Sequence, residues 1–417
     1  MRSGNGRCNF SHQSLDCDRY YNASFVKQAY STLGDERVSP VLAWFDDLGL
    51  IYDELPGSDG MLFPVSRKAN SVLDVLRRAI DEQGIEVCTG TEVVDLELAH
   101  QAFDVSEAAS SSNFERAQRA DRCFSQGNPR FSITMQYEDE QGVATRTISA
   151  QKVIVATGGL GEHFLARSLA SVLPCVPRVS VLGPLATGAP SSIPWQRLNG
   201  IRMNARLAIP VRSFVETGEV LFRDYGISGI VVFNASRYAQ PGDVLLLDMV
   251  PSMELPEVEQ LLMQRVKRFA SRDALGMFDG FLLPAVAEAV LCAAECDYRV
   301  PLSAGSVAHV ARTLKAFPLE VKGLVEPRSA QVQRGGFEIT SFDPHTLEAQ
   351  GIPGLHIVGE ALDIDGPCGG YNLHWAWTSG ILAGRHAARA IVDISSCDIQ
   401  DCAEQPCVCL ADKEDAS

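Results

Sequence analysis

The sequence lacks the features that would assign it to several specialised classes of protein. It contains no stretch of about 18 apolar residues, so we predict no membrane-spanning segment. The first residues do not form a charged and then apolar leader, so we predict a cytoplasmic protein. The 36 Lys and Arg are outnumbered by 52 Asp and Glu, and the net charge of −16 argues against non-specific wrapping of nucleic acid.

Cysteine is too sparse for a disulfide scaffold, with 12 residues among 417, and the C-x-x-C redox motif is missing. Four of these cysteines lie in the tail, at Cys397, Cys402, Cys407 and Cys409, and four thiols at this spacing could ligate zinc. The tail is acidic, has no C-x2-C pair and shows no apolar pattern. We therefore predict reduced thiols, no metal site and a disordered segment over 396–417.

What remains is the composition of an ordinary globular protein. Hydrophobic residues make up 46% and charged residues 21% of the chain, which is enough for a substantial core. At roughly 150 residues per domain, the length predicts two or three domains, or one large domain with insertions.

The first third of the chain has the pattern of an α/β domain. Helices are predicted over 20–34 and 38–50, and a third helix has Asn70 or Ser71 as its N-cap and ends at Gly84. The apolar run Ile85–Cys88 then predicts a strand. A helix, a glycine and a strand in this order are typical of a crossover unit in a parallel sheet.

Three further strands and a glycine turn follow. Strands are predicted over 91–98, 131–137 and 145–149, with a long polar excursion at 106–128 between the first two. The segment from Lys152 to Thr157 predicts a buried strand that runs into Gly158 and Gly159.

From about residue 178 the composition changes. Short strands with turns between them predict a small antiparallel sheet or barrel. They cover residues 179–182, 201–215, 218–222, 230–234 and 243–249. Helices are predicted from Pro256, over 284–295 and over 303–316, and residues 319–324 predict a strand that returns to the barrel.

The C-terminal part contains a strand, a glycine-rich loop and a helix. A buried strand starts at Leu355 and ends in Gly359 and Glu360, and the helix runs from about Leu373 to Val392. Glycine lets backbone amides approach a ligand closely, and a helix N-terminus attracts anions. This arrangement suits a pyrophosphate or an anionic flavin edge, although an ordinary tight turn would have the same pattern.

Several segments, in the same order along almost the whole chain, resemble the BaiN/RdsA-like NAD(P)/FAD-dependent oxidoreductases, a family also called aminoacetone-oxidase-like flavoproteins. The segments that carry the resemblance are residues 3–9 (SGNGRCN), 62–66 (LFPVS), 153–159 (VIVATGG), 218–222 (GEVLF), 225–229 (YGISG), 353–360 (PGLHIVGE), 363–373 (DIDGPCGGYNL) and 379–380 (SG).

The resemblance implies an α/β fold: a Rossmann-like FAD-binding domain with an inserted β-barrel and a small helical domain. The FAD-binding domain would comprise residues 1–177 and 325–395. The barrel would comprise residues 178–255 and 317–324, and the helical insert residues 256–316.

The resemblance also implies a set of residues around FAD. Gly4, Gly6, Arg7 and Asn9 would line the flavin, and Val87 would lie beside the adenine. The other residues that would contact the dinucleotide are Ala156, Thr157, Gly158, Gly159, Gly359, Glu360, Asp365, Gly369, Gly370, Tyr371 and Asn372.

The chain departs from the family at its start. Family members begin with a strand, a G-x-G-x-x-G turn and a helix, which hold the pyrophosphate. None of these precedes Gly4, so we expect an N-terminally truncated or degenerate member that binds FAD weakly. The segment after Gly159 also departs, with Gly161, His163 and Phe164 in place of a glycine- and tyrosine-rich run.

No catalytic acid can be assigned from the sequence. Cys8 and Cys368 fall in flavin-proximal segments, Arg7 could face an anion, and His374 could donate a proton or serve in packing.

Three functions remain open. The first is FAD-dependent redox chemistry on a small molecule, with NAD(P)H as donor. The second is reduction of uridine in ribosomal RNA, with contact through the basic residues Arg265, Lys267, Arg268 and Arg272. The net charge of −16 favours the alternative that these residues are a solvated helix face. The third is a non-catalytic remnant.

Overall fold

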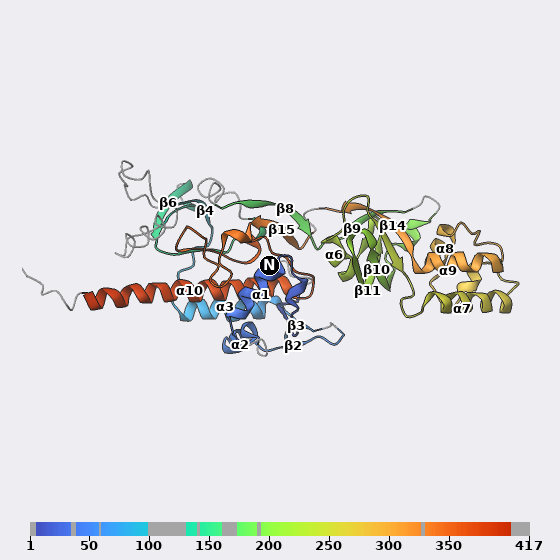
Figure 1. Ribbon diagram of the computed structural model, residues 1–417, viewed down its shortest axis with the longest axis horizontal. Helices are drawn as coiled ribbons and strands as arrows, with labels where there is room; N and C mark the ends of the chain where they lie inside the picture. The colour runs from blue at the N-terminus through green and yellow to red at the C-terminus, as the bar shows by residue number, and fades with distance from the viewer. Residues whose placement is uncertain are drawn as a thin grey trace, which may run out of the picture. The chain divides into compact units, whose positions relative to one another are not determined.

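The computed structural model describes residues 6–34, 39–57, 60–98, 131–139, 142–160, 173–189, 193–326 and 330–401 (Figure 1). The chain divides into two compact units. The first consists of Met1–Pro177, Gly335–Ile364 and Gly370–Ser417, and the second of Arg178–Arg334 and Asp365–Gly369.

The first unit contains a short parallel pair of strands. β7 (Val153–Val155) pairs with β16 (Leu355–Ile357), with Ile154 opposite His356. Both strands lie where the sequence predicts a buried strand. β16 is buried as predicted, but Ile154 at the centre of β7 is 40% exposed, so the predicted burial of this strand is wrong. In the part of the chain that the structure describes, β16 is the only ladder neighbour of β7.

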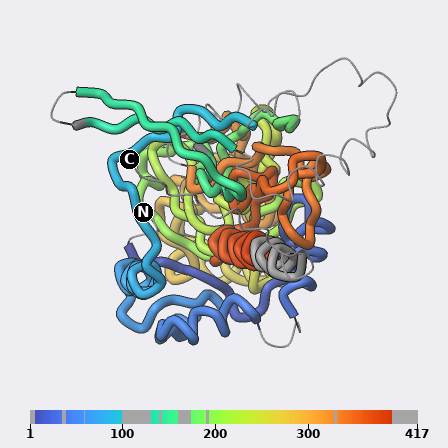
Figure 2. The backbone as a smooth tube through the Cα atoms, turned by 90° about the vertical axis from the view of Figure 1, so that its left-hand side faces the viewer, coloured from blue at the N-terminus to red at the C-terminus, as the bar shows by residue number. Residues whose placement is uncertain are grey.

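An antiparallel meander belongs to the same unit. It consists of β4 (Thr91–Leu98), β5 (Phe131–Asp139) and β6 (Gly142–Ala150), in the order β4-β5-β6. Figure 2 shows the meander as adjacent strands, with α10 (Tyr371–Asp401) seen almost along its axis. The three predicted strands are thus confirmed.

Helices and a three-stranded sheet complete the first unit. The sheet has the order β1-β3-β2. These strands and the remaining helices are β1 (Ser11–His12), β2 (Tyr52–Glu54), β3 (Met61–Pro64), α1 (Ala23–Thr32), α2 (Pro40–Asp47) and α3 (Ala69–Glu82). Pro40 lies in the first turn of α2, where backbone N–H groups have no partner within the helix, so the absence of an N–H in proline costs no hydrogen bond. The Ser39 hydroxyl caps the helix by accepting from the Leu42 amide.

Two further predictions for this unit are wrong. Ile85–Cys88 forms no strand, and its apolar side chains are exposed, 58% at Ile85 and 60% at Val87. A strand needs a neighbour for its backbone groups, and the described residues place none beside this run. The third helix begins at Ala69 with Lys68 as its N-cap, so neither Asn70 nor Ser71 caps it; both lie in its first turn, where the Ser71 hydroxyl is hydrogen bonded to that of Ser66.

The second unit is built on a closed six-stranded barrel with the order β10-β11-β12-β9-β14-β13. These strands are β9 (Leu185–Gly188), β10 (Arg202–Ile209), β11 (Phe214–Arg223), β12 (Gly226–Ser228), β13 (Val244–Asp248) and β14 (Phe317–Leu324). Alternate side chains point inward, so Leu207, Ile209 and Phe222 are fully buried. A separate pair joins β8 (Cys175–Val181) to β15 (Val332–Phe337).

Three helices cover one end of the barrel (Figure 1): α7 (Leu255–Arg268), α8 (Pro284–Ala293) and α9 (Val307–Lys315). Their apolar faces share one hydrophobic cluster with the barrel, which contains Val258, Val290 and Val310 as well as Phe222. The barrel and the helices therefore form one unit rather than two. Residues 325–334 and 365–369, which the sequence-based division places with the FAD-binding part, also belong to this unit.

Two strand predictions in this unit are wrong. The run 201–215, predicted as one strand, is β10, a turn at Pro210–Arg212 and the start of β11, because Pro210 and the positive φ of Ser213 reverse the chain. The run Ile230–Asn234 lies in a helix, α6 (Ile230–Ser236), in which Val231, Val232 and Ala235 are buried. A short apolar run is compatible with either structure, and periodicity cannot separate them. The deciding feature is Gly229, whose φ of +114° lets the chain turn from β12 into a helix.

The described architecture is mixed α/β with an inserted barrel, which confirms the predicted fold class. Among the helices that the structure describes, none combines the length and the apolar character required to cross a membrane.

Gly229→Ala should destabilise the second unit strongly, because its new Cβ would lie 2.3 Å from the carbonyl oxygen of Glu219. Gly242→Ala is the matched control, since Gly242 has a φ of +91° but no atom within 4 Å of an added Cβ. We expect losses of about 3 kcal/mol or more for Gly229→Ala and about 1–2 kcal/mol for Gly242→Ala in urea unfolding. Equal losses would show that contact with β11 plays no part.

Candidate functional site

Two turns meet at one edge of the parallel strand pair. β7 leads through Ala156 and Thr157 into the turn Gly158–Leu160, and β16 leads into the turn Gly359–Ala361. The carboxyl ends of parallel strands lie at the same edge, and these two turns contact each other. This is the edge at which open α/β sheets bind their ligands.

The turn after β7 is open to a ligand. Ala156 and Thr157 are exposed, and Gly158 and Gly159 are half-buried. Gly158 has a φ of +65°, and an added Cβ would find no heavy atom within 4 Å. The backbone of this turn is therefore accessible for close approach by a ligand.

The turn after β16 is instead fixed by α10. The amide of Gly359 donates to the Ser379 hydroxyl at 2.9 Å, and its carbonyl accepts from the Trp375 indole at 3.0 Å. Both backbone groups of Gly359 are therefore already hydrogen bonded within the protein. Glu360, the next residue, is half-buried at the same edge.

The first turn of α10 packs closely against the segment that leads into β1. A Cβ on Gly370 would lie 2.3 Å from the Ser11 carbonyl oxygen and 2.9 Å from Oδ1 of Asn9, so only glycine fits. In the amide orientation that satisfies its hydrogen bonds, Asn9 donates to the Ser11 and Leu62 carbonyls and accepts from the Gly370 amide. Asn9 and Gly370, both expected at FAD, thus contact each other.

Tyr371 lies in the core behind this turn. Its ring is 1% exposed and lies 5.4 Å from the Arg19 guanidinium carbon and 5.3 Å from the Tyr20 ring centre. The Tyr371 hydroxyl accepts from the Asp16 amide, and its carbonyl accepts from the Tyr20 hydroxyl. The structure therefore shows Tyr371 as a packed anchor of the helix start.

His374 follows one turn into α10 and is almost completely buried. Its Nδ1 lies 2.8 Å from the Ser11 hydroxyl, and its Nε2 has no hydrogen-bond partner among the described residues. The hydroxyl of Thr378, one turn further along the same face, is also buried and without a partner there. Buried polar atoms are rarely left unsatisfied, so these two atoms lack a hydrogen-bond partner that the described residues do not supply.

Burial lowers the pKa of His374 to about 3, and the neighbouring His12 adds to the shift. The imidazole is therefore neutral at physiological pH. Burial also raises the pKa of Cys8 to about 11, so its thiol is protonated and a poor nucleophile.

Of the other expected residues of the first unit that the structure describes, three are exposed and one is half-buried. Gly6 and Arg7 are exposed, Val87 is exposed and outside any ladder, and Asn372 is half-buried in the first turn of α10. Gly4 lies outside the described residues, as do His163 and Phe164 of the departing loop and the cysteines from Cys402 onward.

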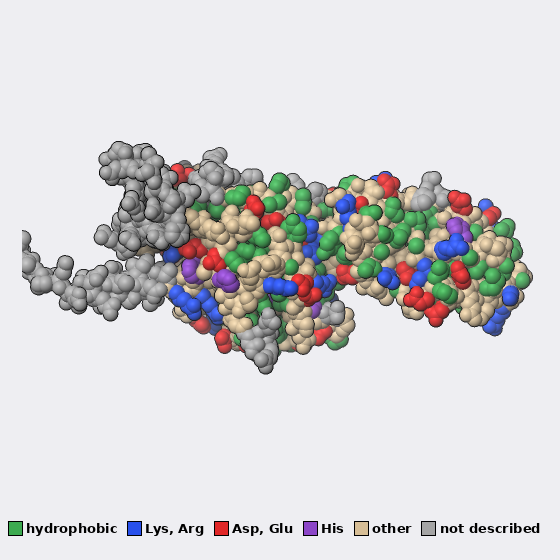
Figure 3. Space-filling model, in the orientation of Figure 1, with side chains coloured by type: hydrophobic (Ala, Val, Ile, Leu, Met, Phe, Trp, Pro, Cys, Tyr) green, Lys and Arg blue, Asp and Glu red, His purple; other side chains and the backbone are tan. Residues whose placement is uncertain are grey.

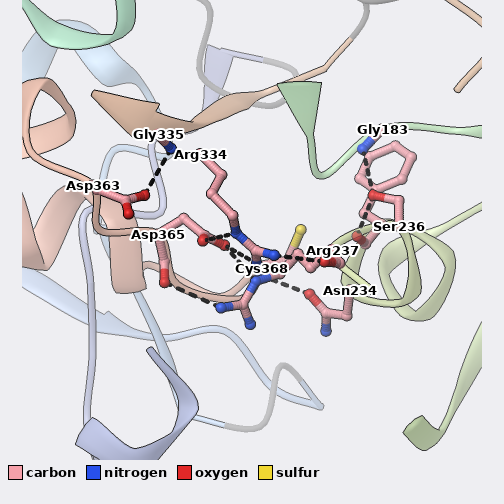
Figure 4. Close-up of polar contacts among 10 residues, drawn as sticks. Gly183, Asn234, Ser236, Arg237, Arg334, Gly335, Asp363, Asp365 and Cys368 are labelled. Carbon is pink, nitrogen blue, oxygen red and sulfur yellow. Dashed lines mark hydrogen bonds and ion pairs between the residues drawn. The ribbon is translucent and has the colours of Figure 1, made fainter. Parts of the chain in front are cut away.

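The loop Asp365–Gly369, counted with the second unit, is held by ion pairs. Asp365 is 0% exposed, and its two carboxylate oxygens each accept from a guanidinium Nε at 2.6 Å, one from Arg237 and one from Arg334 (Figure 4). Charge-assisted bonds of this kind are among the strongest in proteins. Asp365, expected to close on the flavin ring, is fully engaged by these two arginines.

Cys368 is held in the same loop, where its amide donates to Oδ1 of Asn234 at 2.8 Å (Figure 4). The Asn234 amide group in turn donates to Glu216. Burial raises the pKa of Cys368 to about 12, with Glu216 contributing, so its thiol is protonated. Arg237 and Arg334 were missed from the sequence because neither lies in a recognisable motif.

Comparison with known proteins identifies the class. The family described as HI0933-like protein Rossmann domain matches residues 1–386. The chain therefore belongs to the HI0933-like family, which confirms the resemblance seen in its motifs and the Rossmann-like character of the strand pair and its turns.

Particular relatives can also be named. The chain is 29% identical over 416 residues to the 3-dehydro-bile acid delta(4,6)-reductase of Clostridium scindens, covering 93% of this chain and 89% of the relative. It is 24% identical over 400 residues to the ribosomal RNA dihydrouridine synthase of Haemophilus influenzae, again covering 93% and 89%. A solved variant of the FrdA chain of Escherichia coli quinol fumarate reductase aligns with 96% of this chain and 67% of its own, at 13% identity and a TM-score of 0.37.

His374→Asn should reduce the loss of unfolding free energy that accompanies a fall in pH from 7 to 5. Protonation of the buried imidazole favours the unfolded chain, because the pKa is about 3 when folded and ordinary when unfolded. His374 therefore costs stability as pH falls below about 6.5, at up to about 1.4 kcal/mol per pH unit. Urea unfolding at pH 7, 6 and 5 measures this slope, and the exposed His345→Asn should leave it unchanged. An unchanged slope in His374→Asn would contradict the neutral buried imidazole.

Proposed function

We propose that this chain is an FAD-dependent oxidoreductase that reduces a small organic molecule with NAD(P)H as electron donor. The observation that carries the proposal is the pair of adjacent turns at the carboxyl edge of β7 and β16, in a chain of a Rossmann-domain family. An open glycine turn beside a parallel strand is suited to a dinucleotide.

The residues of this edge fit FAD in part. Gly158 leaves its backbone free for close approach, and Glu360 offers a carboxylate to ribityl or ribose hydroxyls. Further along α10, Nε2 of His374 and the hydroxyl of Thr378 are buried without a hydrogen-bond partner among the described residues. Gly359 does not bind phosphate through its amide, since that amide is bonded to Ser379.

FAD would supply hydride and electron transfer, and the protein would supply binding and positioning. Thr157 and Gly158 would contact the dinucleotide from the β7 side. His374, neutral because its pKa is about 3, would act as a hydrogen-bonding group rather than as an imidazolium acid. Cys8 and Cys368 remain protonated and do not serve as a redox pair.

The substrate is proposed only as a class. The relative from C. scindens is named a bile acid reductase, and a reductase needs a source of reducing equivalents. NAD(P)H is a hydride donor that can reduce a bound flavin. Anaerobic mixing of the FAD-loaded chain with NADPH and with NADH should bleach the flavin absorption with at least one of them.

Gly158→Leu tests the placement of FAD. The new side chain would occupy the open face of the turn after β7, so we expect FAD affinity to fall at least about tenfold, which is about 1.4 kcal/mol. Gly90→Leu is a matched control, because Gly90 has nearly the same φ, +67° against +65°, and equally open surroundings. FAD titration followed by flavin fluorescence measures both.

Equal FAD affinities in Gly158→Leu and Gly90→Leu would show that FAD does not bind at the turn after β7. Failure of the unaltered chain to bind FAD would reject the oxidoreductase and leave a non-catalytic relative.

A second candidate is reduction of uridine in ribosomal RNA, favoured by the name of the relative from H. influenzae. The basic residues of α7, together with Arg272 just after it, offer a limited contact surface for RNA. Arg265 donates to the carbonyls of Met277 and Asp279, and Arg272 pairs with Asp279, so both serve the local fold. Lys267 and Arg268 are exposed, and Figure 3 shows acidic and basic side chains interspersed over this part of the surface.

Binding to a ribosomal RNA fragment at several salt concentrations tests this candidate. If RNA contacts α7, Lys267→Ala combined with Arg268→Ala should weaken binding. It should also reduce the slope of log K against log salt concentration by the amount expected for the loss of about 1–2 phosphate contacts. Arg202→Ala combined with Arg299→Ala, at two exposed arginines outside α7, serves as a control of equal charge change. Identical salt slopes in all three proteins would rule out contact through α7.

A further inference from the structure

Two histidines and a glutamate converge in the first unit, apart from the residues assigned to FAD. Nε2 of His356 lies 3.0 Å from Nδ1 of His386, and the ligand atoms of Glu348, His356 and His386 all lie within 4.8 Å of one another. His356 is 0% exposed, and the other two are half-buried. No other group of three or more such side chains occurs among the described residues.

The three residues come from three different elements. His356 is the central residue of β16, His386 lies on α10, and Glu348 lies in the segment before β16, where it forms an isolated bridge with His356. The backbone therefore fixes Glu348 and His356 side by side. The facing helix supplies the third side chain.

The separations suit a tetrahedral ion. Ligand atoms at about 2.0–2.1 Å from zinc lie about 3.3 Å apart, so the two histidine nitrogens would need to move by only a few tenths of an ångström. At 3.0 Å these nitrogens share a single proton, which a cation can replace. Oε1 of Glu348 accepts from the Gly354 amide at 2.6 Å, and Oε2 has no hydrogen bond within the described structure.

We propose that Glu348, His356 and His386 bind a divalent zinc-class cation that joins β16 and α10. Two imidazoles and one carboxylate are a ligand set that zinc and its first-row neighbours accept, with a fourth position for water. The cation would stabilise the strand that leads into the Gly359 turn. This site does not depend on FAD binding.

One nearby group opposes the cation. The Lys152 ammonium lies 3.6 Å from Oε1 of Glu348, on the segment that leads into β7, and it already balances the carboxylate in part. Its positive charge should weaken cation binding. Removing the charge of Lys152 should therefore strengthen cation binding, whereas removing a ligand should weaken it.

The experiment is calorimetric titration of the chelator-treated, full-length chain with Zn²⁺, after the thiols have been blocked with iodoacetamide. We expect one equivalent to bind. His386→Ala, chosen because His386 is only half-buried, should weaken binding at least about 100-fold, and Glu348→Gln should also weaken it. His345→Asn, an exposed histidine nearby, should leave it unchanged.

Co²⁺ gives a second measurement that does not depend on heat. Its visible absorption should indicate four-coordinate geometry in the unaltered chain and should be lost in His386→Ala. Lys152→Met should raise the Zn²⁺ affinity about tenfold. No bound equivalent, equal affinity in His386→Ala and the unaltered chain, or weaker binding in Lys152→Met would each overturn the proposal.

Discussion

The first turn of α10 lies so close to the segment before β1 that Gly370 has no room for a side chain. A Cβ there would lie 2.3 Å from the Ser11 carbonyl oxygen. This contact fixes the start of a helix whose later residues, Trp375 and Ser379, hold both backbone groups of Gly359. The edge of the parallel strand pair therefore depends on one close approach between segments more than 300 positions apart.

The glycine-rich segments serve two different purposes. Gly359 and Gly370 allow close packing, and their surroundings are occupied by the protein's own atoms. Gly158 is the contrasting case, because its turn is open and its surroundings are free. Asp365 resembles Gly359 and Gly370, because its surroundings are also occupied by the protein: two guanidinium groups pair with its buried carboxylate. A motif that looks like a ligand site in sequence can thus be largely a packing device.

Most elements of the fold could be predicted from apolar periodicity, including α1, the meander and the strand pair. The failures have local causes. The run Ile230–Asn234 begins with four consecutive apolar residues and has no helical period, so its helix could not be distinguished from a strand. Ile85–Cys88 has the composition of a strand but no neighbour in the described structure. For the site, resemblance indicated the segments, but the pairing of Asn9 with Gly370 and the roles of Arg237 and Arg334 depend on tertiary contacts that no spacing reveals.

The most direct test of the account is a crystal structure of the full chain grown with FAD. The account predicts density for the dinucleotide along the turn Gly158–Leu160 and the neighbouring turn Gly359–Ala361, with backbone atoms of Gly158 in contact. Density for FAD bound away from both turns would contradict the central claim. So would a fully loaded crystal in which the turn after β7 touches only solvent.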